Sequence, residues 1–164
     1  MDLDQIVENA YYESVTGIRT GDTKTECREL RKYIRDAKEI IVPNHSDAKV
    51  IAINEVLEMF GLSKAKHLQI HTDACDVSRM PAITKAIMAL DTCSCDLVIA
   101  RGRLGIPGSG SMLVILDRKG RLLTASLSPP HIIHGKAVSD AVRDEMTNAL
   151  ERIGFTKSRE KDEC

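Results

Sequence analysis

Short apolar segments alternate with longer segments of helical periodicity, and this alternation constrains the fold more than any other feature. The first short segment, residues 39–43, is rich in β-branched residues and ends at a proline, as is typical of a buried strand. Two later segments predict further strands, and two apolar runs flank Asp117-Arg118-Lys119-Gly120, a strong hairpin signal. These four segments are 67–72, 96–100, 112–116 and 121–127. The order predicts an α/β fold in which helices cover both faces of a mixed central sheet.

The segments between and around these strands have apolar residues at helical spacing. The predicted helices span residues 2–15, 23–38, 48–60, 81–90 and 135–153. Asp2 or Asp4 can cap the first helix, and Gly61 is placed to end the third. No internal repeat and no linker rich in proline or glycine divides the chain. We therefore predict a single domain over residues 1–164, with a frayed charged tail from residue 154.

Composition excludes several classes of function. The formal net charge is -1, and the chain has three Tyr, two Phe and no Trp, which argues against a nucleic-acid-binding protein. No apolar run is long enough to cross a membrane, and the acidic N-terminus does not resemble a secretory signal, so we expect a cytoplasmic protein. The five cysteines are odd in number, and Cys93 and Cys95 are spaced neither as a redox pair nor as a zinc knuckle. Free thiols are expected.

The densest functional signal is a glycine-rich segment with two arginines, Arg101-Gly102-Arg103-Leu104-Gly105-Ile106-Pro107-Gly108-Ser109-Gly110-Ser111. Its four glycines allow close approach of the backbone to a ligand, and exposed N–H groups in such a loop can bind an anion. The arginines add forked donors that suit phosphate or carboxylate. The segment is neither a Walker A loop nor a dinucleotide fingerprint, because a strand follows it and no Gly-Lys-Ser/Thr is present. A plain strand connection is the alternative interpretation.

A second signal, Asn44-His45-Ser46-Asp47-Ala48-Lys49, follows the first predicted strand and opens a helix. Ligands of open α/β sheets usually bind at the carboxyl ends of strands, and a helix N-terminus there attracts anions. Lys49 is placed to reach a phosphate. A simple N-cap by Ser46 or Asp47 is equally compatible with the pattern.

Two further groups of polar residues are candidates for the same site. His131 and His134 follow a stiff Pro-Pro turn, which suggests contact with a ligand, although buried, merely hydrogen-bonded histidines remain an alternative. Asp73 and Asp76 follow the second predicted strand, where carboxylates can hold Mg²⁺ through its waters, or simply act as loop and cap residues.

These segments resemble those of the inosine/xanthosine triphosphate pyrophosphatase superfamily. Val42-Pro43-Asn44 followed by Lys49 is similar to the first strand of that group with its Asn and Lys, and the segment from Cys95 to Gly102 resembles the strand that ends in an acidic residue and glycines. Asp117-Arg118-Lys119-Gly120-Arg121 and Ser128-Pro129 resemble the hairpin and serine-rich loop that follow. The chain carries Arg101 where those hydrolases have a glutamate. This difference disfavours triphosphate hydrolysis and leaves nucleotide binding open.

A closer resemblance, over nearly the whole chain, is to the HcgB family of guanylyltransferases, which serve biosynthesis of the iron-guanylylpyridinol cofactor of [Fe]-hydrogenase in methanogens. The segment from Arg101 to Ser111 is its most specific part. The resemblance implies a pyrophosphatase-like fold, a homodimer, a requirement for Mg²⁺, and transfer of GMP from GTP to a pyridinol hydroxyl with release of pyrophosphate.

The site residues are assigned as hypotheses within that resemblance. Nucleotide and substrate anions are assigned to Asn44, Lys49, Arg101, Gly102, Arg103, Gly105, Gly108, Ser109, Gly110 and Ser111. The metal is assigned to Asp73 and Asp76, and catalytic contacts to Arg101, Lys49, His131 and His134, where a histidine polarises the acceptor hydroxyl. Two other functions remain open: a nucleoside triphosphate pyrophosphatase acting on non-standard purine nucleotides, and a non-catalytic nucleotide-binding module.

Overall fold

The computed structural model of the chain describes residues 1–158, which form two compact units. The first comprises Met1–Asp36, and the second begins at Ala37. The single domain expected over residues 1–164 stays a prediction.

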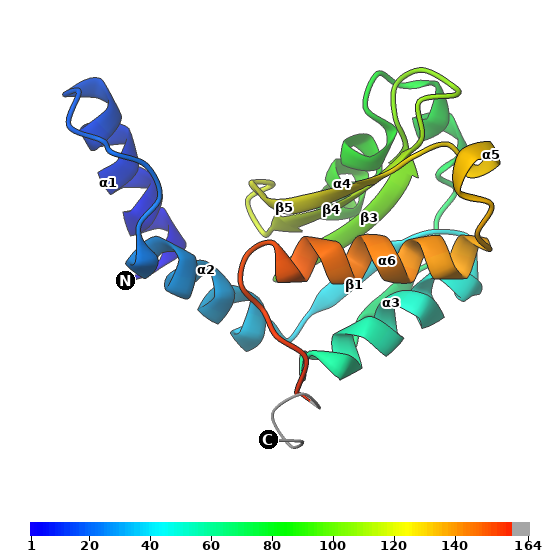
Figure 1. The fold of residues 1–164 in the computed structure, drawn as a ribbon, viewed down its shortest axis with the longest axis horizontal. Helices are drawn as coiled ribbons and strands as arrows, with labels where there is room; N and C mark the ends of the chain where they lie inside the picture. Colours follow the sequence, from blue (N-terminus) through cyan, green and yellow to red (C-terminus); the bar gives the residue numbers. More distant parts are fainter. Residues whose placement is uncertain (159–164) are drawn as a thin grey trace. The chain divides into compact units, whose positions relative to one another are not determined.

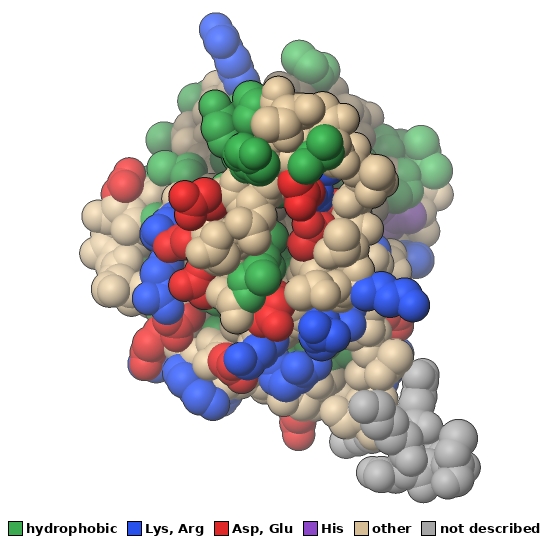
Figure 2. Space-filling model, turned by 90° about the vertical axis from the view of Figure 1, so that its left-hand side faces the viewer, with side chains coloured by type: hydrophobic (Ala, Val, Ile, Leu, Met, Phe, Trp, Pro, Cys, Tyr) green, Lys and Arg blue, Asp and Glu red, His purple; other side chains and the backbone are tan. Residues whose placement is uncertain are grey.

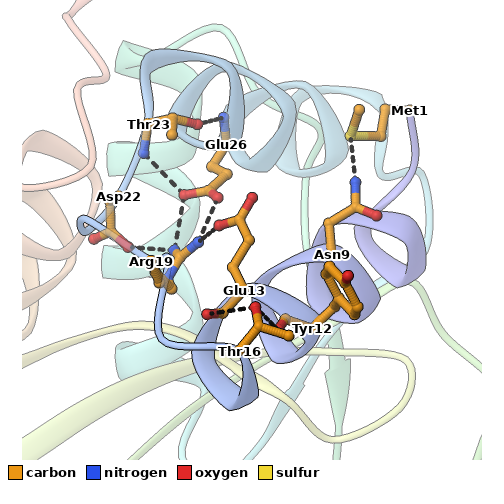
Figure 3. A network of polar contacts seen from close by, with 9 residues as sticks. All are labelled: Met1, Asn9, Tyr12, Glu13, Thr16, Arg19, Asp22, Thr23 and Glu26. Carbon is orange, nitrogen blue, oxygen red and sulfur yellow. Dashed lines mark hydrogen bonds and ion pairs between the residues drawn. The ribbon is translucent and has the colours of Figure 1, made fainter.

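The first unit consists of two helices, α1 (Leu3–Val15) and α2 (Lys24–Asp36), both predicted from the sequence. Asp2 caps α1 by accepting a hydrogen bond from the Gln5 N–H at 2.9 Å. At the start of α2, Thr23 and Glu26 form a capping box: the Glu26 N–H donates to the Thr23 hydroxyl, and the Thr23 N–H donates to the Glu26 carboxylate. Arg19 lies between the helices, where its guanidinium group contacts three carboxylates, those of Glu13, Asp22 and Glu26 (Figure 3).

The second unit is built on a five-stranded sheet in the order β2-β1-β3-β4-β5. Strand β1 is parallel to both β2 and β3, whereas the β3–β4 and β4–β5 pairs are antiparallel. The strands are β1 (Ile40–Pro43), β2 (Lys66–Leu68), β3 (Leu97–Arg103), β4 (Ser111–Asp117) and β5 (Leu122–Ser128). The predicted α/β fold with a mixed sheet and a late hairpin is confirmed.

Helices cover both faces of this sheet (Figure 1). They are α3 (Asp47–Met59), α4 (Pro81–Thr92) and α6 (Val138–Glu151). Two short helical turns, η1 (Asp73–Val77) and α5 (His131–His134), lie in the connections. The alanines of α4 pack against Val98 and Ala100, which point to one face of β3. Because side chains alternate along a strand, Ile99 and Arg101 point to the opposite face, where α6 and α3 lie.

Two predicted boundaries were wrong at the functional end of the sheet. The predicted strand 96–100 continues as β3 through Arg103, because Arg101, Gly102 and Arg103 pair with Leu113, Met112 and Ser111 of β4. The predicted strand 67–72 ends at Leu68.

The C-terminal part of the chain also differs from prediction. The predicted helix 135–153 is the shorter α6, Val138–Glu151. Its expected first residue, Gly135, instead takes a positive φ of 63° and ends α5, which the sequence did not predict. Phe155 lies in the predicted tail but is buried. Residues 159–164 of that tail lie outside the described residues.

The surface shows no dominance of one charge sign on the face drawn in Figure 2, where acidic and basic side chains are interspersed. Among the described residues, no helix combines the length and apolarity needed to cross a bilayer.

Cys27, Cys75, Cys93 and Cys95 are free thiols, as expected. Burial raises the pKa of the Cys95 thiol to about 11, so this thiol resists ionisation at neutral pH.

Candidate functional site

The candidate site lies at the carboxyl ends of β1 and β3. These strands run parallel, with Ile41 level with Val98, so three residues further on Asn44 comes level with Arg101. The segment that begins at Asn44 and the segment that begins at Arg101 therefore leave the same edge of the sheet. In open α/β sheets this edge is where ligands bind.

Asn44 shapes the turn into α3. It is buried, its N–H donates to the Leu68 carbonyl at 3.2 Å, and its side-chain oxygen accepts from the Ser46 N–H at 3.1 Å. Ser46 occupies the N-cap position but makes no side-chain capping hydrogen bond, and Asp47 is the first helical residue and pairs with His67 at 2.8 Å. The N-cap position predicted for Ser46 or Asp47 is thus held by Ser46, but the side chain that accepts a backbone hydrogen bond there is that of Asn44.

Lys49, in the first turn of α3, is partly buried among other charges. Burial lowers the pKa of its ammonium group, and the nearby cations of Arg101 and Lys85 lower it further. The carboxylates of Asp76 and Glu145 act in the opposite direction. The charges of Lys85 on α4 and Arg101 on β3 thus act on Lys49 of α3, so three separate elements contribute cations to this region.

Arg101 is fixed from inside the protein. Its Nε–H donates to both carboxylate oxygens of Glu145, at 3.1 and 2.9 Å, and its Nη2 donates to the Ser111 hydroxyl at 2.9 Å. Glu145 belongs to α6 and is 0% exposed, whereas the Arg101 side chain is 15% exposed. Arg101 thus reaches from a buried carboxylate to the protein surface.

Lys85 supports the same strand from the α4 side. Its Nζ donates to the Arg101 carbonyl at 3.2 Å and lies 3.5 Å from Asp76 Oδ1. Arg103 also contacts this region, because its Nη2 donates to the Asp76 carbonyl at 3.2 Å. Asp73 is more exposed and lies 3.9 Å from His45.

The glycines of the loop allow it to lie against neighbouring backbone. A Cβ on Gly105 would come within 2.3 Å of the Arg79 carbonyl oxygen, and a Cβ on Gly110 within 2.2 Å of the Ser128 carbonyl oxygen. Gly110 also has a φ of 103°, which side-chain-bearing residues rarely adopt. The Ser109 hydroxyl donates to the Ile106 carbonyl, so this serine closes a turn within the loop.

A cavity of about 400 Å³ opens beside Arg101. Its lining combines the guanidinium and hydroxyl groups of the site with an apolar wall from the Pro-Pro turn, α5 and α6. The lining residues are Arg101, Gly108, Gly110, Ser111, Pro129, Pro130, His131, Ile132, His134, Val138 and Ala141. The rings of His131 and His134 meet edge to face at 5.1 Å. His134 Nδ1 accepts from the Lys136 N–H at 2.9 Å, so in the neutral ring Nε2 carries the proton and is a donor.

The structure brings together residues predicted from separate segments. Arg101, Gly108, Gly110, Ser111, His131 and His134 line the cavity, and the charge of Arg101 acts on Lys49. The other predicted residues lie outside the cavity lining: Asn44, Lys49, Gly102, Arg103, Gly105, Ser109, Asp73 and Asp76.

Sequence reasoning missed two charged residues of the site, Lys85 and Glu145. Each occupies a position on an apolar helical stripe: Lys85 lies between Ala82 and Ala89, and Glu145 follows Ala141 by one turn. A charge on such a stripe was the available signal, because charged side chains are seldom buried unless they are paired.

Comparison with protein families finds a match that covers most of the chain. A family model described as "FeGP cofactor biosynthesis protein HcgB, guanylyltransferase" matches residues 3–155 of the 164 residues. The match spans both compact units and every residue of the site described above. The chain therefore belongs to the HcgB family of FeGP cofactor biosynthesis guanylyltransferases.

Proposed function

We propose that this guanylyltransferase joins GMP from GTP to the hydroxyl of a substituted pyridinol and releases pyrophosphate. The observation that carries the proposal is the approach of three cations, Lys49, Lys85 and Arg101, next to a cavity with an apolar wall. A triphosphate requires concentrated positive charge, and an aromatic acceptor requires apolar surface. Both are present at one edge of the sheet.

The reaction balances without a redox partner. The pyridinol oxygen forms a bond to the α-phosphorus of GTP, the bond from that phosphorus to the oxygen bridging to the β-phosphate breaks, and pyrophosphate leaves. The hydroxyl proton passes to solvent or to a nearby base. Positioning and charge stabilisation account for most catalysis of this kind, which suits a site made of fixed guanidinium and ammonium groups.

The histidines have unequal roles in this proposal. His134 Nδ1 already accepts a backbone hydrogen bond, so the neutral ring offers a proton at Nε2 and can polarise or orient an oxygen of the acceptor. The His131 ring contacts the His134 ring and has no hydrogen bond within residues 1–158, so in this proposal it accepts the hydroxyl proton.

The proposal includes Mg²⁺ held by Asp73 and Asp76. Among residues 1–158, no group of three His, Cys, Asp or Glu side chains is arranged to hold a metal ion. Mg²⁺ usually binds to one or two carboxylates together with waters and substrate phosphates, so the two carboxylates of η1 fit an ion that arrives with GTP. The ion would neutralise part of the charge on the phosphates.

Measurement of pyrophosphate release tests the reaction. With GTP, we expect release only when the pyridinol is present. Release from inosine or xanthosine triphosphate without an acceptor would instead identify a nucleotide pyrophosphatase. GTP binding without release under either condition would identify a nucleotide-binding module.

We further propose that the protein is a homodimer and that α1 contributes to the interface. No residue of α1 is buried, and Val7, Tyr11 and Val15 recur at helical spacing with exposed side chains. Light scattering should then report twice the 18.1 kDa mass of one chain. Tyr11→Glu is expected to give the monomer, whereas Ile51→Glu, a matched exposed position on α3, is expected to leave the dimer intact. Dimer loss in the Ile51 variant alone would assign the interface elsewhere.

A further inference from the structure

Glu145 is a buried ionisable group for which the proposed reaction has no direct use. It is 0% exposed, and both of its carboxylate oxygens accept from Arg101 Nε–H. It does not line the cavity that Arg101 and Ser111 enter. Glu145 can therefore influence the reaction only through the side chains that it contacts, Arg101 and Ser111.

The contacts of Glu145 restrict Arg101 to one orientation. The Glu145 carboxylate accepts a hydrogen bond from Arg101 Nε–H. The Ser111 hydroxyl accepts one from Arg101 Nη2 at 2.9 Å and itself lies 3.4 Å from Glu145 Oε2. A guanidinium group is planar, so fixing Nε and Nη2 fixes the whole plane. Within residues 1–158 no recorded hydrogen bond uses Nη1, so this nitrogen retains its donors for a ligand.

The cost of burying this pair is an argument for a role beyond stability. A buried ion pair often stabilises a protein no more than apolar residues of the same volume would, because both ions lose their hydration. The neighbours of Glu145 on α6, Ala141, Val142, Met146 and Ala149, are all apolar and buried, so an apolar residue at position 145 would continue the stripe.

We propose that Glu145 is a positioning residue: it fixes the guanidinium plane of Arg101 through Nε and so directs Nη1 toward the phosphate and acceptor groups that react. The inference rests on the proposed function, since it names the residue that orients a group of that same site. Glu145 itself touches neither substrate.

The activity test uses Glu145→Gln, which keeps the volume of the side chain but removes its charge. We expect kcat for transfer to fall about tenfold, because small displacements of positioned groups are costly. The KM for GTP is expected to stay within threefold of the wild-type value or to fall, because a negative charge has been removed next to three cations. An unchanged kcat would overturn the proposal, and so would a rise in KM with kcat retained.

Asp117→Asn provides the matched control. Asp117 is also 0% exposed and pairs with Arg121 Nε at 2.6 Å, but it lies at the other end of β4, in the turn toward β5. Both variants disturb a buried carboxylate–arginine pair. Equal losses of kcat in the two variants would mean that the effect is general destabilisation and would reject positioning.

A second measurement does not depend on activity. In a ¹⁵N–¹H spectrum, the Nε–H of Arg101, assigned by its disappearance in Arg101→Lys, should exchange slowly with water in the wild type and quickly in Glu145→Gln. Fast exchange in the wild type would contradict the proposal that Glu145 holds the Nε–H of Arg101 in a stable hydrogen bond. If the wild type shows slow exchange but transfers no GMP, the proposed function fails while the orientation of Arg101 by Glu145 stands.

Discussion

Arg101→Ala is expected to lower the free energy of unfolding by about 3–5 kcal/mol, because it leaves a carboxylate fully buried without its cation. The carboxylate is that of Glu145, whose only other recorded hydrogen bond within residues 1–158 comes from the Ser111 hydroxyl at 3.4 Å. Urea unfolding followed by circular dichroism measures the change.

A double variant separates the loss of a charge partner from the loss of packing. Arg101→Met combined with Glu145→Met replaces the pair with apolar side chains of similar size, and we expect it to recover most of the stability that Arg101→Ala loses. If the double variant is as unstable as Arg101→Ala, packing rather than charge explains the loss.

Arg121→Ala is the control at a second buried carboxylate. Asp117 keeps two backbone donors when Arg121 is truncated, the N–H groups of Lys119 and residue 121, both at 2.9 Å. Its desolvation is therefore still partly compensated. We expect a smaller loss of stability than in Arg101→Ala, and an equal loss would show that the number of remaining donors does not matter.

The sequence predicted the sheet well where strands are apolar and β-branched, and less well where they are not. The segment that became β1 ends at Pro43 as expected, but Arg101-Gly102-Arg103 was interpreted as loop and is strand. Glycine and arginine are typical of loops, yet pairing with β4 satisfies the backbone there. The missing side chain of Gly102 also lets α4 approach, since a Cβ would lie 2.7 Å from the Ala82 nitrogen. Local composition does not contain that tertiary contact.

The candidate site was predictable in part for a topological reason. The segment from Asn44 was expected to bind a ligand because it follows the carboxyl end of a predicted strand. The structure adds that β3 runs parallel to β1, so Arg101 lies at the same edge of the sheet. Glu145 was not predicted, because charged helix residues are normally assigned to solvent. Recognising its role required knowing that Arg101 lies beneath α6.

Lys49→Met is expected to raise the Kd for GTP by up to about 100-fold, since hydrogen bonds to charged groups contribute about 1.5–3 kcal/mol. Lys49 is placed in the first turn of α3, where the helix N-terminus adds to its attraction for anions. Lys49→Arg is the matched variant, because it keeps the positive charge. Calorimetric titration with GTP at neutral pH compares the three proteins.

The pH dependence of GTP binding provides a sharper test of Lys49. Its pKa lies below the ordinary 10.5, chiefly because of burial and then because of Arg101 and Lys85, while Asp76 and Glu145 oppose these effects. If the ammonium form binds phosphate as proposed, affinity should fall as pH rises through this lowered pKa, below 10.5. Lys49→Arg should keep its affinity over that range, since arginine stays protonated. A parallel fall in Lys49→Arg would assign the titration to another group.

Folding stability should change in the opposite direction over the same range. Because the pKa of Lys49 is lower in the folded than in the unfolded chain, the unfolded chain binds more protons between the two values. The free energy of unfolding contributed by Lys49 therefore rises with pH there, while GTP affinity falls. Lys49→Met should remove both slopes together. If Lys49→Met removes the pH dependence of GTP affinity but not that of the free energy of unfolding, the pKa of Lys49 is not lowered by folding. Burial among cations would then not explain the pH dependence of binding.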